Sequence, residues 1–240
     1  MWNVRPIELR KQSVLIRELT IGEAMQIAKI PQSMTEARLT SFIGFVCDDD
    51  AIAHKMTAQE RYYVFLHYLS LAQNDYVFNV DDDTLFLTTN PKDVPDTAVI
   101  DGITVSHLTG RQVMVLEGKC ENAYEWLAGQ MACQLTGDIG TLLGVDGMMW
   151  VDMPDDEQSI GEMVDERFEQ IQNLPQSQFE KLAQVYFVGC DELAHCVRLG
   201  VDNDGLTLLS DGGDAMQAVR FRPDVCFTDI TEHLSQYLAQ

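Results

Sequence analysis

The stretch at residues 13–31 (SVLIRELTIGEAMQIAKIP) decides how the start of this chain folds. Its apolar run at residues 14–16 favours a short strand. Thr20 and Glu23 then form a capping box, because the hydroxyl and the carboxylate of such a pair each accept a hydrogen bond from a free amide at a helix start. Pro31 ends the helix, since proline cannot continue the backbone ladder. Apolar residues keep helical spacing between the two signals: Ile21, Ala24, Met25, Ile27 and Ala28. The stretch therefore predicts a strand, a turn and a helix, with no catalytic group.

Two further helices are predicted after the first. One spans residues 35–46, where apolar residues recur at helical spacing, and the acidic run at 48–50 ends it. The other has the clearest signal of the chain, because Thr57 and Glu60 repeat the capping box. An apolar and aromatic stripe follows this box to about residue 71.

From residue 76 the pattern changes to that of strands. Residues 76–80 and 84–89 flank the acidic run 81–83, which predicts a hairpin with an acidic turn. Residues 99–105 place Asp101 and Gly102 between two apolar runs, a strong hairpin signal. Residues 111–118 (RQVMVLEG) are another strand candidate, so the middle of the chain is predicted to be rich in β-structure.

Helical spacing returns after residue 120. Helices are predicted at residues 121–135, 159–171 and 178–187, and Ser159 with Glu162 forms a third capping box. Residues 195–201 and 205–209 predict two strands that the turn Asp202-Asn-Asp-Gly joins, and residues 228–238 predict a final helix.

Taken together, these patterns predict an α+β fold. It consists of an N-terminal strand with helices at residues 1–75, β-rich hairpins at 76–120, a helical segment at 121–187, and a small C-terminal β/α region that contains cysteines at 188–240.

The formal charge of the 240-residue chain is -22, with 38 acidic and 16 basic side chains. Such a balance argues against binding of nucleic acid, which needs clustered Lys and Arg, and against an anionic membrane surface. It fits solubility, a basic partner, or a subunit held among many others.

No apolar run approaches the roughly 20 residues that cross a bilayer, and the first residues lack the apolar core of a signal peptide. We therefore expect a protein without a membrane span that is made in the cytoplasm. The six cysteines should then be mainly reduced thiols, and most should be small buried apolar residues.

Four residues near the end have the side chains that zinc prefers: Cys190, His195, Cys196 and Cys226. Their spacing is wider than that of the usual paired ligands. A lost zinc site, or no site, is therefore the favoured interpretation, and no other cofactor is indicated. The acidic runs at 48–50, 81–83 and 202–204 could hold calcium, but the Glu expected after the glycine of the last run is missing, which favours solvated turns.

Motifs of catalysis are not found. The chain has no G-x-S-x-G elbow, no phosphate-binding glycine loop and no H-E-x-x-H. Its five histidines are dispersed, and none lies beside a motif that gives it a role. The sequence thus favours a protein that is not an enzyme, with a metal-dependent enzyme or module at the cysteine-rich end as an alternative.

The order of a strand, a capped helix, a second helix and the segment 57–66 (TAQERYYVFL) resembles tail proteins of bacteriophages. In particular it resembles the baseplate hub subunit of contractile-tailed phages of the T-even kind. The opening at residues 17–20 (RELT) is also similar to that of small acidic tail assembly chaperones. The resemblance covers residues 13–71 and a cysteine-containing segment at the end, where hub proteins can carry Cys-x-x-Cys and this chain has the wider spacing of Cys190 and Cys196.

The resemblance implies a structural subunit of a phage tail tip or baseplate, located in the virion, that contacts hub and tape-measure proteins. The alternative is a tail assembly chaperone that binds the tape-measure protein transiently. Because aromatic side chains are enriched at interfaces, we expect the partner to contact one helix. The expected contact residues are Tyr62, Tyr63, Phe65, Leu66 and Tyr68.

Overall fold

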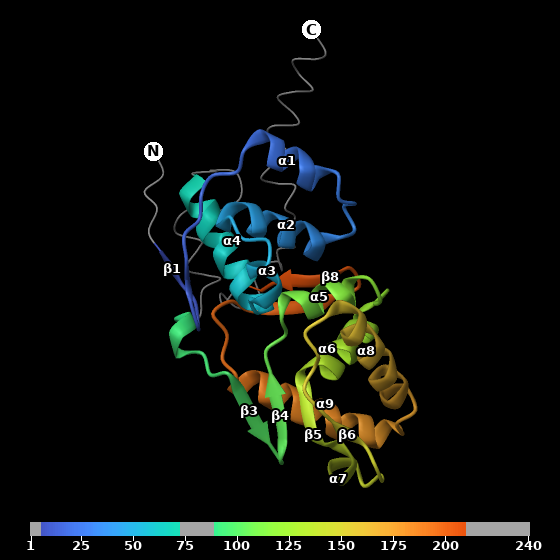
Figure 1. The fold of residues 1–240 in the computed structure, drawn as a ribbon. Coiled ribbons are helices and arrows are strands. Elements are labelled where there is room, and N and C mark those ends of the chain that lie inside the picture. The colour runs from blue at the N-terminus through green and yellow to red at the C-terminus, as the bar shows by residue number, and fades with distance from the viewer. Residues whose placement is uncertain (1–5, 73–88, 210–240) are drawn as a thin grey trace.

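The computed structural model describes residues 6–72 and 89–209, and these residues form an α+β fold (Figure 1). The helices are α1 (Ile21–Ala28), α2 (Thr35–Cys47), α3 (Ile52–Lys55), α4 (Ala58–Ala72), the 3-10 helix η2 (Pro91–Asp93), α5 (Gly110–Glu117), α6 (Ala123–Gln134), α7 (Ile139–Leu143), α8 (Glu157–Gln172) and α9 (Gln176–Glu192). The strands are β1 (Ile7–Glu8), β2 (Ser13–Val14), β3 (Thr97–Ile100), β4 (Ile103–Ser106), β5 (Leu135–Asp138), β6 (Met149–Trp150), β7 (Leu199–Asp202) and β8 (Gly205–Leu208).

The three predicted N-terminal helices are confirmed. Thr20 and Glu23 form the reciprocal capping box of α1, and Thr57 and Glu60 form the same pair of bonds before α4. Helix α2 ends where Asp48 takes a left-handed conformation with φ of 53°. The predicted strand is shorter than expected, because β2 pairs with β1 over only two residues.

The middle hairpin at Asp101 and Gly102 is also confirmed. Both residues have positive φ, 51° and 81°, as a two-residue hairpin turn of this type requires. Strands β3 and β4 then continue into an antiparallel sheet of order β3-β4-β5-β6. The other predicted hairpin, at residues 76–89, lies almost wholly outside the described residues, as does the predicted helix at 228–238.

The strand predicted at residues 111–118 is wrong, because this segment is helix α5. Its N-cap is Thr109, which forms a capping box with Gln112. Val113 and Leu116 are fully buried three residues apart, which is helical rather than strand spacing. The apolar run therefore contributes one face of a short helix.

The helical segment is confirmed with different boundaries. Helix α8 begins one turn earlier than the box of Ser159 and Glu162 predicts, because the Asp156 side chain accepts a hydrogen bond from the Ser159 amide and caps the helix. Helix α9 is longer than predicted and spans Gln176–Glu192. After it, β7 and β8 pair as the predicted hairpin, although β7 begins only at Leu199.

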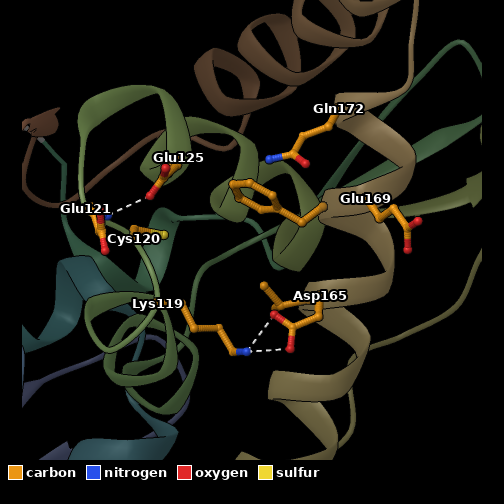
Figure 2. A pocket seen from close by; sticks show the side chains of 9 residues that line it. Lys119, Cys120, Glu121, Glu125, Asp165, Glu169 and Gln172 are labelled. Carbon is orange, nitrogen blue, oxygen red and sulfur yellow. Dashed lines mark hydrogen bonds and ion pairs between the residues drawn. The ribbon is translucent and has the colours of Figure 1, made fainter.

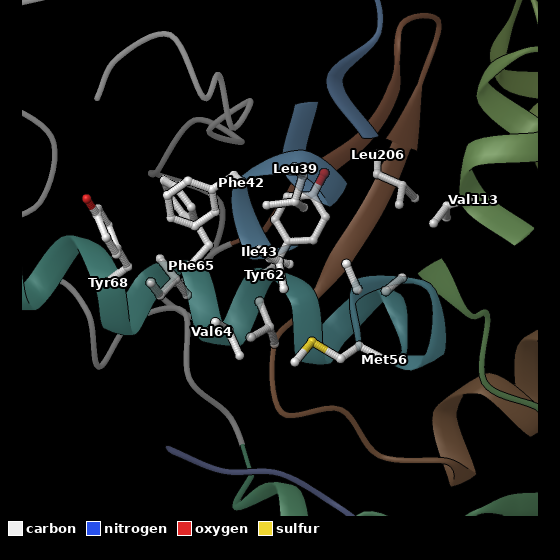
Figure 3. Close-up of a cluster of buried hydrophobic side chains, with 14 of the residues drawn as sticks. Leu39, Phe42, Ile43, Met56, Tyr62, Val64, Phe65, Tyr68, Val113 and Leu206 are labelled. Atoms are coloured by element: carbon white, nitrogen blue, oxygen red, sulfur yellow. The ribbon is translucent and has the colours of Figure 1, made fainter. Parts of the chain in front are cut away.

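The described residues form a first core among α2, α4, α5 and the β7–β8 hairpin, where Phe42 packs on Phe65 and Leu206 lies beside Val113 (Figure 3). It draws residues from all four predicted sequence regions, from Ile7 to Leu208. The division into four regions therefore stays a prediction, because no single region encloses this core.

A buried ion pair lies within the first core. The Arg61 guanidinium, which is fully buried, lies 3.1 Å from the Glu36 carboxylate and donates to the Glu36 carbonyl and the Thr40 hydroxyl, each at 2.7 Å. The Tyr62 hydroxyl donates to the other Glu36 oxygen at 2.6 Å. These bonds join α2 to α4 where solvent cannot compete for them.

The second core lies between the four-stranded sheet and helices α6, α7 and α9 (Figure 1). Gly189 of α9 lies against Val105 of β4 so closely that a β-carbon there would be 2.3 Å from the Val105 Cγ2. Arg167 of α8 is buried, donates to the carbonyls of Ala132 and Val151, and lies over the Trp150 ring at 5.1 Å. Gly189 therefore allows the close approach of α9 to β4. Arg167 connects α8 by hydrogen bonds to the end of α6 and to the segment after β6.

Candidate functional site

The five side chains expected to contact a partner do not form a common surface. Four of them, Tyr62, Phe65, Leu66 and Tyr68, are buried within the chain. The Phe42 ring packs edge-on against Phe65 and Tyr68, with centroids 5.0 and 4.8 Å apart. These four therefore form part of the core, which corrects the expectation of an aromatic interface on α4. Tyr63 is partly exposed, and its ring packs on His67.

The predicted zinc ligands do not come together among the described residues. Cys196 belongs to the first core, whereas Cys190 packs against the second and hydrogen-bonds Tyr186. His195 Nδ1 lies 3.3 Å from Gln59 Nε2. Over residues 6–72 and 89–209, no three His, Cys, Asp or Glu side chains are arranged to hold a metal ion, and Cys226 lies outside this part. The same finding covers the described acidic runs at 48–50 and 202–204.

The described cysteines are poorly suited to nucleophilic chemistry, which requires the thiolate. Burial raises the pKa of the Cys190 thiol to about 11 and that of Cys196 to about 12. Burial also lowers the pKa of His195 below its ordinary value, so this imidazole is neutral near pH 7.

A concave site lies between α6, the end of α9 and the β7–β8 hairpin, and we call it the α6–α9 cavity. Its volume is about 480 Å³, within the range of roughly 300–1,000 Å³ that is usual for ligand sites. Apolar side chains from several elements line most of it, among them Leu127, Leu199, Val201 and Leu206.

A small polar network lies at the inner wall of the α6–α9 cavity. The Tyr186 hydroxyl is 3.0 Å from Gln130 Oε1 and 3.1 Å from Gln134 Oε1. Gln134 Nε2 donates to the carbonyl of Ser106 at 2.7 Å. Gln130 is only 9% exposed, yet its Nε2 makes no hydrogen bond within the described part of the chain. This amide is available to a group that enters the cavity.

Two aromatic side chains border the cavity and extend into solvent. Tyr124, near the start of α6, is 85% exposed, and Phe187 of α9 is 50% exposed. Exposed aromatic rings beside a concave apolar site are typical of protein interfaces. Asp191 and Arg198 contribute charges of both signs to the same lining.

An acidic groove of about 390 Å³ lies on the other side of α6, against α8 (Figure 2). Both carboxylate oxygens of Asp165 accept hydrogen bonds from Lys119 Nζ, at 2.6 and 2.7 Å. The remaining charged side chains of the groove are all carboxylates: Glu121, Glu125 and Glu169. The groove therefore presents negative charge beyond what its lysine neutralises.

The residues of the polar network were not predicted as a site. Gln130 and Gln134 lie four residues apart and therefore on one face of a helix that is otherwise apolar there, which is the sequence signal that could have identified them. Nothing in the local sequence links them to Tyr186, more than fifty residues away, because only the packing of α9 against α6 brings the three together.

Comparison with protein families, with curated proteins and with solved structures finds no match to this chain. Within the described residues, no helix is both long and apolar enough to cross a membrane.

Proposed function

We propose that this chain is a non-catalytic structural subunit of a bacteriophage tail tip or baseplate, which acts by binding hub or tape-measure proteins. The observation that carries the binding role is the α6–α9 cavity with its exposed rings of Tyr124 and Phe187. Exposed apolar surface beside a concave site is typical of a binding surface, and aromatic side chains often supply the strongest contacts of an interface.

The assignment to a phage tail is supported by the resemblance of residues 13–71, whose order of elements is that of β2, α1, α2 and α4. The charge of -22 and the carboxylates of the acidic groove fit a subunit that packs beside basic surfaces. The raised thiol pKa values support a role without covalent chemistry.

Proteomics of purified virions tests the assignment. A structural subunit should occur in mature particles at a fixed low copy number. Presence only in infected-cell lysate, bound to the tape-measure protein, would instead identify a transient assembly chaperone. Absence from both would contradict any role in the tail.

The binding role is tested by replacing Tyr124 and Phe187 with Ala together. Because Tyr124 is 85% exposed and Phe187 is half exposed, the double variant should lose little thermal stability, while its affinity for the tail partner found in virions falls by about tenfold or more. Val99→Ala is a suitable control, since Val99 is 62% exposed on β3 and does not line the cavity. Equal affinities of the control and the double variant would show that the rings are not the contact.

A further inference from the structure

The β7–β8 hairpin has a hydrogen-bond pattern that is fixed by one bond beyond its end. The Leu209 amide donates to the Arg198 carbonyl at 3.0 Å, so these two residues form a hydrogen-bonded pair. Opposite residues of an antiparallel ladder alternate between bonded and non-bonded pairs. The pairs Gly200–Thr207 and Asp202–Gly205 are therefore bonded, whereas Leu199–Leu208 and Val201–Leu206 are not.

It follows that the N–H and C=O groups of Leu199 and Val201 point away from β8. No third strand pairs with β7 among the described residues, and no backbone bond to these groups occurs there. Strand β7 is also the more accessible of the two, since all four residues of β8 are buried and none of β7 is. An accessible strand edge of this kind is a template for another strand.

This edge lies at the α6–α9 cavity. Leu199, Gly200 and Val201 are consecutive residues of β7, and all three line the cavity together with Gln130. Because Gly200 has no side chain, it lines the cavity with backbone atoms of β7, while Val201 and its pair Leu206 line it with side chains from one face of the hairpin. Outward backbone groups, apolar walls and the unused amide of Gln130 therefore lie at one site.

We propose that the β7 edge and the α6–α9 cavity form one docking site for a short extended segment of a partner protein. The segment pairs with the outward groups of Leu199 and Val201, places an apolar side chain in the cavity, and accepts a hydrogen bond from Gln130 Nε2. The site rests on the proposed function only for the identity of the partner, a hub or tape-measure protein. Strand addition supplies affinity through main-chain bonds, and the pocket for alternate side chains supplies specificity.

A segment of polypeptide fits these features better than a compact small molecule. Two outward N–H and C=O pairs, separated by one residue, match the repeat of a second strand. The exposed rings of Tyr124 and Phe187 extend the contact surface beyond the cavity, which suits a ligand longer than the cavity itself.

The first experiment uses short overlapping peptides that span the hub and tape-measure proteins encoded in the same genome, tested for binding to the full chain. For a peptide that binds, hydrogen exchange of individual amides is compared with and without it. The amides of Leu199 and Val201 should exchange more slowly in the complex. The Gly200 amide should change little, because it already bonds to β8. Unchanged exchange at Leu199 and Val201 would overturn the proposal.

The second experiment compares Val201→Pro with Val201→Ala. Proline removes the outward N–H but no bond to β8, and proline is tolerated on edge strands at such positions. Both variants lose the valine side chain, so the alanine variant controls for packing. The proline variant should bind the peptide about tenfold more weakly than the alanine variant, as expected for loss of a main-chain hydrogen bond. Equal affinities would overturn strand addition.

A third variant, Gln130→Met, keeps the length of the side chain and removes the amide. Tyr186 retains Gln134 as a partner, so the network should persist. Binding should weaken by several fold, and unchanged binding would exclude the Gln130 contact. If the chain occurs in virions but no peptide binds, the docking site fails while the proposed function stands; if it is absent from virions and lysate complexes, the function itself fails.

Discussion

The buried ion pair of Arg61 and Glu36 shows how single residues tie the N-terminal helices together. Both side chains are almost fully buried, and the arginine also donates to the carbonyls of Glu36 and Gly110 and to the Thr40 hydroxyl. Taking two charges out of water is costly, and the contacts of the pair offset that cost. The largest effect on stability is therefore expected when one partner is removed, because the other charge then stays buried without a counter-ion.

We expect Arg61→Met to lower the free energy of unfolding by about 3–5 kcal/mol, because the Glu36 carboxylate would stay buried without its cation. Urea denaturation measures this change. Lys119→Met is the control, since Asp165 of the Lys119–Asp165 pair is 67% exposed and ion pairs at the surface contribute about 0–1 kcal/mol. A similar small loss for both variants would show that the buried pair is not critical. Adding Glu36→Leu to Arg61→Met should recover part of the lost stability.

Glu117 is a second residue with a measurable effect, because it caps a helix other than its own. Its two carboxylate oxygens accept hydrogen bonds from the amides of Glu36 and Ala37 at the start of α2, at 2.7 and 3.0 Å. Burial outweighs these bonds and raises the pKa of Glu117 from 4.5 to about 7. The folded state therefore binds this proton more tightly than the unfolded state does.

The sign of the pH effect follows from that difference in pKa. The contribution of Glu117 to stability is fully present below about pH 4.5 and is lost as the pH rises through about 7. Denaturation of the wild type and of Glu117→Gln at pH 5 to 8 should show a difference in free energy of unfolding that changes with pH. The histidines occur in both proteins and cancel in this difference. A difference that is constant with pH would contradict the raised pKa.

At the scale of elements, the contact of α9 with β4 depends on Gly189. A β-carbon at this position would lie 2.3 Å from the Cγ2 of Val105, so the helix or the strand would have to move. Overpacking of this kind costs about 1–3 kcal/mol. Gly189→Ala should therefore lower the melting temperature, and Val105→Ala in the same chain should restore part of it.

Gly22→Ala is the matched control for this helix–sheet contact. Gly22 also lies in a helix, but the nearest atom to its β-carbon would be the Thr20 hydroxyl oxygen at 4.0 Å. Alanine is favoured over glycine in helices by about 1 kcal/mol, so this variant should be as stable as the wild type or more stable. Equal losses in both variants would show that close packing at Gly189 is not the cause.

The elements also show what local sequence could and could not predict. The capping boxes that begin at Thr20 and Thr57 predicted α1 and α4, because the apolar residues after each box have helical spacing and no strand pattern. Thr109 and Gln112 form the same box before α5, but the apolar run after it also fits a strand, and only burial of one face decides between the two. At α8 two capping signals lie one turn apart, and Asp156 rather than Ser159 caps the helix.

At the scale of the whole molecule, the prediction of an α+β fold is confirmed. The burial of the α4 side chains and the position of the α6–α9 cavity could not be predicted, because both depend on contacts between segments far apart in the sequence. The aromatic stripe of α4 has the composition of an interface, yet it fills the core because α2 covers it. The α6–α9 cavity combines α4, α6, α9 and the β7–β8 hairpin, which are separated by long stretches of chain. Its aromatic border at Tyr124 could be found only by knowing which rings remain exposed.

The first core has a consequence for how the protein is made. It contains Ile7 and Leu9 together with Leu206 and Leu208, so its last members leave the ribosome long after its first. During translation, the core residues of α1 to α4 are therefore made before Leu206 and Leu208 can pack against this cluster. We expect these helices to need shielding by general chaperones of the host until synthesis reaches β8, and the fold to close only after that point.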